Sequence, residues 1–250
     1  LVPWNGTGRL NVLLIGTDKQ PREGTWNTDT LIVASIDPAS RQVAMFSLPR
    51  DTVGVPLPPI PARSAFGATW DRKINALFGQ ARARPDLFPG GGYEGLKETL
   101  GYLYGIPINY FVEVDFSGFK TVVDALGGVT VNVQVPVVDD YYPGDAGTLR
   151  VYIPTGVQRM SGSQALVYAR SRHGSSDFDR ASRQQRVILS LRQQADFATL
   201  LQRLPDLIQA TTKTVKTAFP PDKLSHLLEL ARRIDAGKLN LWTYDHYHAS

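Results

Sequence analysis

Residues 11–18 read Asn-Val-Leu-Leu-Ile-Gly-Thr-Asp, and this stretch decides the fold class. An apolar run that ends at a glycine is typical of a buried strand entering a loop. Similar runs occupy residues 30–36 and 42–48, and only the short segment 37–41 separates them, so we expect these two strands to form a hairpin. Because the runs are continuously apolar, we expect both faces of the sheet to be covered.

Helical patterns and further strands fill the rest of the chain. We predict helices over residues 74–84, 93–104, 115–126, 161–169 and 180–195, with two more before Pro220 and after Asp222. Further strands are predicted over residues 109–114, 129–135 and 238–244. The proline-rich segment 53–64 and the polar segment 139–147 are expected to be irregular. This order of elements predicts an α/β fold, a three-layer α/β/α domain with a central mixed sheet, formed by residues 1–250 as a single domain.

Composition narrows the function classes. The chain has 250 residues, 27 Lys and Arg against 23 Asp and Glu, and no cysteine. The absence of cysteine excludes disulfides, thiol catalysis and cysteine-ligated zinc. No stretch approaches the roughly 18 apolar residues of a membrane span. Because the sequence starts at Leu1 rather than Met, we expect a processed chain from which an N-terminal membrane anchor is missing.

The densest charge lies in residues 170–186, which hold five arginines and two aspartates in seventeen positions. The planar guanidinium fork matches phosphate oxygens, so we interpret the cluster as half of a site for a pyrophosphate-bearing substrate. The alternative is a solvated basic loop and helix. Arg170 and Arg172 alternate as at the end of a strand, where both would point the same way. Arg180 and Gln184 are four apart on the predicted helix and share a face.

Charged residues also stand next to the ends of the first three predicted strands. Asp18 ends the first and Asp29 precedes the second, so both carboxylates are expected at one edge of the sheet. Paired carboxylates suit Mg²⁺, which takes one or two of them together with phosphate oxygens; ordinary turn chemistry is the alternative. Arg50 adds a cation near this edge, and Lys73 stands just before a helix, where the helix dipole disfavours a positive charge.

These motifs occur in an order that resembles the LytR-CpsA-Psr family of cell-wall glycopolymer ligases, from about residue 10 to residue 195. The matching segments are residues 11–18, 28–30, 47–52, 73–76, 114–119, 123–129, 164–172, 177–180 and 183–185. The resemblance implies a membrane-anchored protein whose catalytic domain is extracytoplasmic. It also implies transfer of a glycopolymer from a polyprenyl-pyrophosphate lipid to peptidoglycan through a phosphodiester bond.

Site residues carry over from the family position by position. The resemblance implies Mg²⁺, or Mn²⁺, held by Asp18 and Asp29. It implies pyrophosphate ligands at Arg50, Lys73, Arg170, Arg172, Arg180 and Gln184. Arg50 and Arg172 would also stabilise charge during the reaction, and Asp177 would activate the acceptor hydroxyl.

The family also implies a long apolar pocket for the lipid tail. We expect the helix that follows Asp115 and one face of the arginine-rich helix to line it, and its predicted residues are Phe116, Phe119, Val123 and Ile188. On spacing alone, the same positions are typical of an ordinary core.

Two departures from the family pattern affect the site. Asn27 stands where the family often has an arginine. The sequence Asp177-Phe178-Asp179-Arg180 replaces the common Asp-x-Gly-Arg, so either Asp177 or Asp179 can be the base.

Three other functions remain open on the sequence. A polyprenyl-pyrophosphate hydrolase would use the same site with water as acceptor. A non-catalytic module would bind the lipid phosphate without turnover. A nucleic-acid-binding regulator has only the basic cluster in its favour, and the chain lacks a helix-turn-helix signature, so we expect no nucleic-acid partner.

Overall fold

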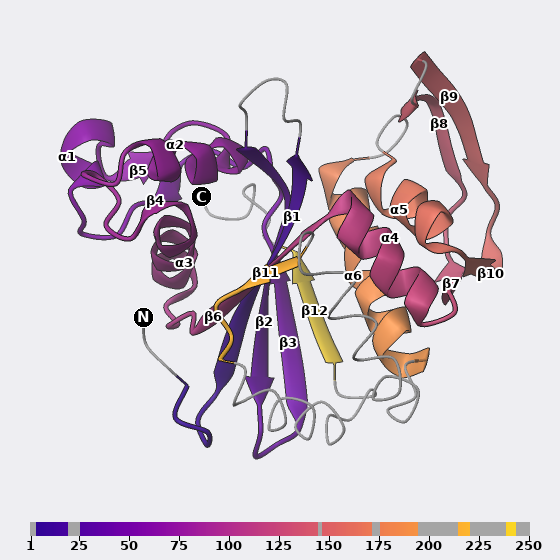
Figure 1. Cartoon of the computed structure of the whole chain (residues 1–250), viewed down its shortest axis with the longest axis horizontal. Helices are drawn as coiled ribbons and strands as arrows, with labels where there is room; N and C mark the ends of the chain where they lie inside the picture. The colour runs from indigo at the N-terminus through magenta and orange to yellow at the C-terminus, as the bar shows by residue number, and fades with distance from the viewer. Residues whose placement is uncertain are drawn as a thin grey trace. The chain divides into compact units, whose positions relative to one another are not determined.

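The computed structural model describes residues 4–19, 26–144, 147–171, 176–194, 215–220 and 239–243 (Figure 1). Of Asp18 and Asp177 it describes the backbone alone. Arg172 and the two helices predicted before Pro220 and after Asp222 lie outside these residues. The chain divides into two compact units, which we call the sheet unit (Leu1–Asp115 and Lys216–Ser250) and the arginine unit (Phe116–Val215). The assignment of residues 1–250 to a single domain stays a prediction.

A six-stranded mixed sheet forms the centre of the sheet unit, in the order β11-β6-β1-β2-β3-β12. The strands are β1 (Leu10–Lys19), β2 (Trp26–Asp37), β3 (Gln42–Ser47), β6 (Tyr110–Asp115), β11 (Val215–Thr217) and β12 (Leu239–Thr243). β2 pairs antiparallel with both β1 and β3, whereas β6 runs parallel to β1 and β12 runs parallel to β3. The predicted hairpin, the α/β class and the mixed sheet are therefore confirmed.

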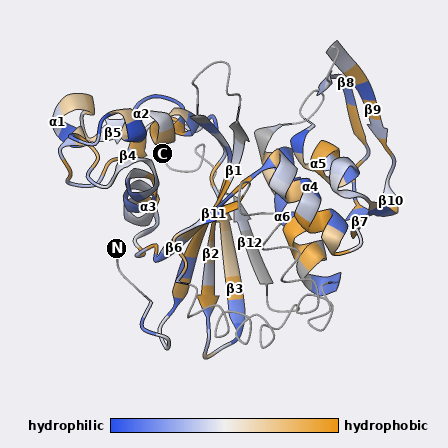
Figure 2. Cartoon of the chain, viewed as in Figure 1, coloured by the Kyte–Doolittle hydropathy of each residue, from blue (hydrophilic) through white to orange (hydrophobic). Residues whose placement is uncertain are grey.

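Both faces of the sheet carry buried apolar side chains, as the continuous apolar runs predicted. Figure 2 shows that hydrophobic residues occupy much of the central strands, such as β2 and β6. On one face, Leu13 and Leu31 pack with α2 (Leu77–Ala83) and α3 (Gly91–Tyr104). Successive strand residues point to opposite faces, and Val12 belongs to a second buried cluster, with Leu10, Trp4 and Tyr110.

The proline-rich segment is more ordered than the sequence indicated, so the prediction of irregular structure over residues 53–64 was wrong. It contains β4 (Val55–Pro56) and the start of α1 (Ala62–Phe66), and β4 pairs with β5 (Thr69–Trp70). Val55, Leu57 and Trp70 are buried in the core, and this burial stabilises the short pairing. Pro61 precedes the first helical residue, where a missing N–H costs little.

The described residues of the arginine unit form three helices and two small sheets. Its elements are α4 (Phe116–Ala125), β7 (Val129–Val133), β8 (Val137–Gly144), β9 (Gly147–Ile153), β10 (Gly156–Met160), α5 (Gly162–Arg170) and α6 (Asp177–Gln194). β10 pairs with β7, and β8 pairs with β9. After α4 the chain turns through Gly127 and Gly128 at φ +80° and +93°, a conformation that favours glycine, as predicted.

The polar segment 139–147 is largely strand, so the prediction of a loop was wrong there. In β8, Val137 and Asp139 are buried, whereas the intervening Val138 is exposed. This alternation is typical of a half-buried strand, but the acidic residues at positions 139 and 140 hid it from a reading based on hydropathy.

α5 begins with a capping box at Ser161. The Gln164 backbone N donates to Ser161 Oγ over 3.3 Å, and the Ser161 backbone N donates to Gln164 Oε1 over 2.9 Å. A Cβ atom at Gly162 would collide with the backbone of Lys120 in α4, so this glycine permits the two helices to approach closely. Among the described residues, no helix combines the length and the apolar character needed to cross a membrane.

Candidate functional site

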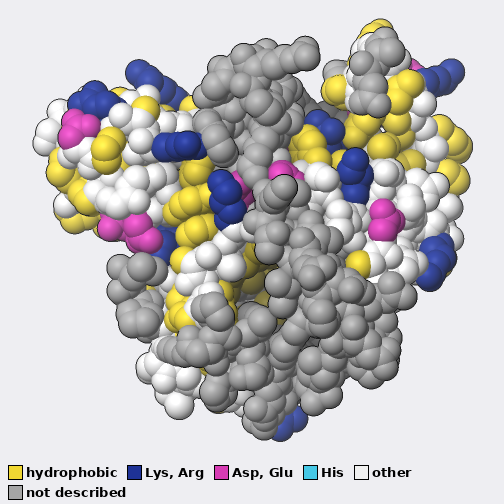
Figure 3. All heavy atoms as spheres, viewed as in Figure 1, with side chains coloured by type: hydrophobic (Ala, Val, Ile, Leu, Met, Phe, Trp, Pro, Cys, Tyr) yellow, Lys and Arg dark blue, Asp and Glu magenta, His cyan; other side chains and the backbone are white. Residues whose placement is uncertain are grey.

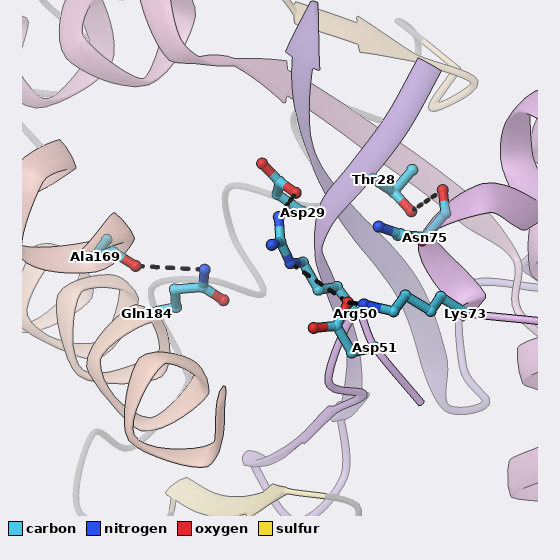
Figure 4. Close-up of polar contacts among 8 residues, drawn as sticks. All are labelled: Thr28, Asp29, Arg50, Asp51, Lys73, Asn75, Ala169 and Gln184. Carbon is cyan, nitrogen blue, oxygen red and sulfur yellow. Dashed lines mark hydrogen bonds and ion pairs between the residues drawn. The ribbon is translucent and has the colours of Figure 1, made fainter. Parts of the chain in front are cut away.

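In the sheet unit, Arg50 lies between two carboxylates (Figure 4). Its Nη1 is 2.5 Å from Asp29 Oδ1, and its Nε is 3.8 Å from Asp51 Oδ1. Lys73 Nζ is 3.1 Å from the same Asp51 oxygen. We call these four residues the Arg50 cluster; it brings together the predicted residues Asp29, Arg50 and Lys73.

Strand register explains why Arg50 meets Asp29. Ile32 in β2 pairs with Ser47 in β3, and Leu48 N donates to the Leu31 carbonyl over 3.0 Å. Continuing this register by two residues places Arg50 level with Asp29, just beyond the end of β3.

Backbone hydrogen bonds bring the Lys73 segment to the same place. Ile74 N donates to the Thr52 carbonyl over 2.9 Å, and Asn75 N donates to the Arg50 carbonyl over 3.1 Å. These bonds hold Lys73 beside Asp51, so two segments that are separate in the sequence form one cluster.

The Arg50 side chain is 18% exposed and that of Asp29 is 20% exposed. Among the described residues, the buried Nε of Arg50 has no hydrogen-bond partner, because the 3.8 Å separation from Asp51 is too long for a hydrogen bond. A buried donor without a partner costs about 1–3 kcal/mol. The Arg50 side chain as a whole stays partly exposed, so an anion would meet its guanidinium at that exposed part.

The backbone of Asp18 lies at the same end of the sheet. Asp18 pairs with Asn27, two residues before Asp29, just beyond a register shift between Gly16 and Thr17. Among the side chains that the structure describes, no group of three or more His, Cys, Asp or Glu is arranged to hold a metal ion. One or two carboxylates still fit Mg²⁺ when phosphate oxygens complete its coordination shell. The half-buried Asp29 offers one such carboxylate.

In the arginine unit, Arg170 is the last residue of α5, so the prediction that it lies on a strand end was wrong. Ser171 N donates to the Val167 carbonyl over 3.0 Å and carries the helical pattern past Arg170. The Arg170 guanidinium carbon is 3.8 Å from the centre of the Phe116 ring, and Nη1 donates to Tyr142 Oη over 3.4 Å. The aromatic ring and the hydroxyl together orient this cation.

Arg180 and Gln184 lie four residues apart on α6, as predicted. Arg180 is 4% exposed. Gln184 Nε2 reaches the Ala169 carbonyl near the end of α5, at 3.5 Å (Figure 4). Gln184 is therefore next to Arg170 in the fold.

α6 begins at Asp177, three residues earlier than predicted, because Ser176 and Asp179 cap it. Ser176 donates to Asp179 Oδ2 from its backbone N over 2.9 Å and from its Oγ over 2.8 Å, and Asp179 N donates back to Ser176 Oγ over 3.2 Å. The hydrogen bonds from Ser176 lower the pKa of Asp179 below its ordinary value. Asp179 thus has a role at the helix start, which favours Asp177 as the base.

The residues predicted for the lipid pocket have different environments. Val123 is fully buried in the apolar core of the arginine unit, and Phe119 packs against that core. Phe116 lies under Arg170, and Ile188 is half-buried on α6. The lipid pocket itself stays a prediction.

Sequence reasoning missed three residues of these sites. Asp51 follows Arg50 directly, and this adjacency was the available signal. Tyr142 lies 28 residues before Arg170 in a segment expected to be a loop, so no local signal marked it. Arg183 lies within the arginine cluster but donates to backbone carbonyls.

Comparison with known proteins identifies relatives over most of the chain. The model of the LytR_cpsA_psr family matches residues 3–245. TagV of Bacillus subtilis (strain 168), named a polyisoprenyl-teichoic acid–peptidoglycan teichoic acid transferase, is 29% identical over 212 residues, which are 83% of this chain and 49% of TagV. A TagU protein of Bacillus cereus with the same type of name is 27% identical over 86% of this chain and 62% of its own length. The chain thus spans less than two thirds of either relative.

Solved structures share the fold. The crystal structure of B. subtilis TagV has a TM-score of 0.71 and 26% identity, and the match covers 96% of this chain and 85% of that one. A structure described as TagT bound to LI-WTA has a TM-score of 0.66 at 22% identity, with coverage of 98% and 83%. At that identity, the second match supports the fold alone.

Proposed function

The chain belongs to the LytR_cpsA_psr family, and from this premise we propose that it transfers a glycopolymer from a polyprenyl-pyrophosphate carrier to peptidoglycan. The observation that carries the proposal is the Arg50 cluster: a half-buried arginine between two carboxylates, with one buried nitrogen that has no hydrogen-bond partner among the described residues. The names of the TagU and TagV relatives indicate teichoic acid as the class of polymer.

The reaction exchanges a phosphoanhydride bond for a phosphate ester bond. A hydroxyl oxygen of the peptidoglycan sugar attacks the phosphorus that carries the glycopolymer, and the P–O–P bond to the carrier breaks. Polyprenyl phosphate leaves with the bond electrons, and the hydroxyl proton passes to a base. The products are a phosphodiester and the lipid phosphate. Catalysis of such a transfer rests mainly on positioning and charge stabilisation.

In the sheet unit, Arg50 and Lys73 would bind phosphate oxygens. Asp29 and Asp51 flank the partly exposed Arg50 guanidinium and orient it before substrate binds, and preorganised donors of this kind stabilise developing negative charge. One carboxylate oxygen of Asp51, Oδ1, lies close to both cations and helps to hold them in place.

In the arginine unit, three arginines would bind phosphate oxygens: Arg170, Arg172 and Arg180. Gln184 would add a neutral ligand. Contacts with Phe116 and Tyr142 orient the Arg170 guanidinium before substrate binds. Asp177 would accept the hydroxyl proton, since the Asp179 carboxylate is occupied by Ser176.

A divalent cation fits the donor set of the sheet unit. Asp29, together with Asp18, would hold Mg²⁺ or Mn²⁺, which when bound neutralises charge on the pyrophosphate. The chain's own residues would bind the phosphates, orient the acceptor and accept its proton. The proposed setting is the outer side of the cytoplasmic membrane, where both the carrier lipid and peptidoglycan are accessible.

The proposal is tested by incubating the purified chain with a polyprenyl-pyrophosphate glycopolymer, Mg²⁺ and a peptidoglycan fragment, and by mass spectrometry of the products. A phosphodiester-linked polymer and released polyprenyl phosphate are expected, with Mn²⁺ supporting the same product. A free glycopolymer phosphate as the only product would indicate a hydrolase. Tight lipid binding without turnover would indicate a binding module, and either result would overturn the proposed transfer.

A further inference from the structure

Side chains of α6 bind the carbonyl groups at the C-terminal end of α5. The last four carbonyls of an α-helix have no partner within the helix. In α5, Ser171 N and Ser171 Oγ both donate to the Val167 carbonyl. Residues of α6 donate to the next carbonyls, and Arg183 makes two of these hydrogen bonds.

Arg183 binds two carbonyls that flank Arg170. Its Nε donates to the Tyr168 carbonyl over 3.0 Å, and its Nη2 donates to the Ser171 carbonyl. Two other residues of α6 also contact this segment of α5. Gln184 donates to the Ala169 carbonyl, and Arg186 donates to Tyr168 Oη over 3.0 Å. The segment from Tyr168 to Ser171 is thus held at both ends by one guanidinium.

The Arg183 side chain is 6% exposed, and burying a cation is costly unless it has partners. Burial lowers the pKa of Arg183 from its ordinary value, while Tyr168, Asp179 and Asp139 favour the charged form. The negative end of the α5 dipole further stabilises a cation at this position. An arginine that serves only solubility would be exposed, so the burial of Arg183 indicates a structural role.

We propose that Arg183 is a positioning residue that fixes the end of α5 and thereby the orientation of Arg170. Arg170 is the last residue of α5, and its guanidinium must stack on Phe116 and reach Tyr142. If the segment from Tyr168 to Ser171 shifts, the Arg170 guanidinium shifts with it. This inference rests on the proposed function, because it assumes that Arg170 binds phosphate oxygens.

The test compares Arg183→Ala and Arg183→Lys with wild type and with Arg159→Ala. Arg159 is a matched control, because its Nη2 donates to the Gly127 carbonyl just past the end of α4, over 2.5 Å. In Arg183→Ala we expect kcat to fall by about 10- to 100-fold with a smaller change in KM, because misplacing a catalytic group by about 1 Å costs on this order. Added guanidinium ion should restore part of the loss, whereas Arg159→Ala should keep wild-type turnover. Arg183→Lys keeps the charge without the fork and should lie between Arg183→Ala and wild type.

A second measurement needs no turnover. Hydrogen exchange at the Ser171 amide, which donates to the Val167 carbonyl, should accelerate in Arg183→Lys and stay unchanged in Arg159→Ala. Wild-type turnover and wild-type exchange in a folded Arg183→Lys variant would overturn the inference. Accelerated exchange would support it even if Arg183→Ala fails to fold. Absence of transfer by the wild-type chain would instead count against the proposed function.

Discussion

Arg50 in the sheet unit and Arg183 in the arginine unit are both largely buried arginines, yet their partners differ. Arg50 pairs with the carboxylate of Asp29 and keeps a buried nitrogen without a hydrogen-bond partner among the described residues. Arg183 donates to two backbone carbonyls at a helix end. We therefore expect the partly exposed Arg50 to bind a substrate anion and Arg183 to organise the backbone. The partner, rather than the residue type, decides the role.

Charge elsewhere on the molecule is less organised. On the face drawn in Figure 3, the described Lys and Arg side chains are scattered among other residue types and do not form a continuous stripe. The expected absence of a nucleic-acid partner stays a prediction.

The largest effect is expected for Arg50→Ala. Transfer should slow by about 10²-fold or more, as when a preorganised donor is removed from a charge-stabilising site. The measurement is the initial rate of phosphodiester formation. Arg9→Ala is the matched control, because Arg9 also pairs with an aspartate across the sheet, Asp37, at 3.3 Å. Equal rates for Arg50→Ala and Arg9→Ala would remove Arg50 from the site.

Phe116→Leu should have the next largest effect. It removes the ring beneath the Arg170 guanidinium, a contact worth about 0.5–2 kcal/mol. Binding of the pyrophosphate carrier, measured by titration calorimetry, should weaken by about 2- to 30-fold, the same range of free energy expressed as affinity. Phe66→Leu is the control, because the Phe66 ring also lies near an arginine, Arg72, at 5.7 Å, but is not a predicted site residue; it should leave the affinity unchanged. If the two variants bind alike, the stacking does not contribute.

Ser176→Ala should lower the free energy of unfolding by about 1 kcal/mol, because it removes the cap of α6. Ser182→Ala, at an exposed position within α6, is the control for denaturant unfolding. The Asp179 pKa is lowered in the folded chain, so its contribution to stability is present at neutral pH and is lost as the pH falls through that pKa. The difference between Ser176→Ala and wild type should therefore shrink in acid. A difference that does not depend on pH would contradict the capping role of Asp179.

The smallest effect is expected for Glu98→Gln in the sheet unit. Partial burial, followed by the charge of Glu94, raises the pKa of Glu98. The folded chain thus disfavours the ionised form, and the substitution should slightly raise the melting temperature at neutral pH. This gain should vanish in acid, where Glu98 is protonated in both the folded and the unfolded chain.

Asp86→Asn is the matched control for this substitution, because it also neutralises one carboxylate of the sheet unit. The hydrogen bond from Arg84 lowers the pKa of Asp86, so the folded chain favours its ionised form. Asp86→Asn should therefore act in the opposite direction and lower the melting temperature at neutral pH. Melting temperatures that move the same way in both variants would contradict the assignment for Glu98.

Much of the fold was predictable because strand formation follows local apolar runs. The strands at residues 11–15, 30–36 and 42–48 and the hairpin that joins the last two were predicted and are confirmed. The predictions failed at residues 53–64 and 139–147, where prolines and acidic residues conceal short strands. β4 forms because Trp70, 15 residues further along, provides its partner, whereas β8 pairs with the next strand, β9, in a local hairpin.

The site was predictable in its residues but only partly in its contacts. The family resemblance, which the family match confirms, pointed to Asp29, Arg50 and Lys73. Strand register brings Arg50 to Asp29, and backbone hydrogen bonds bring the Lys73 segment to Arg50. The choice between Asp177 and Asp179 as the base stays a prediction, and the contacts of Asp179 with Ser176 favour Asp177.

By itself, the sequence determined the apolar strands of the central sheet, most helices and the family, and it predicted a set of charged residues as pyrophosphate ligands. These follow from local apolar periodicity and from motifs that are continuous along the chain. Only the tertiary structure decided which arginine meets a carboxylate, which meets an aromatic ring and which meets a helix end. Those contacts join residues far apart in the chain, such as Arg170 with Phe116 and Tyr142. The local sequence around a cation does not determine its partner, because the partner comes from a distant segment that packs against it only in the folded chain.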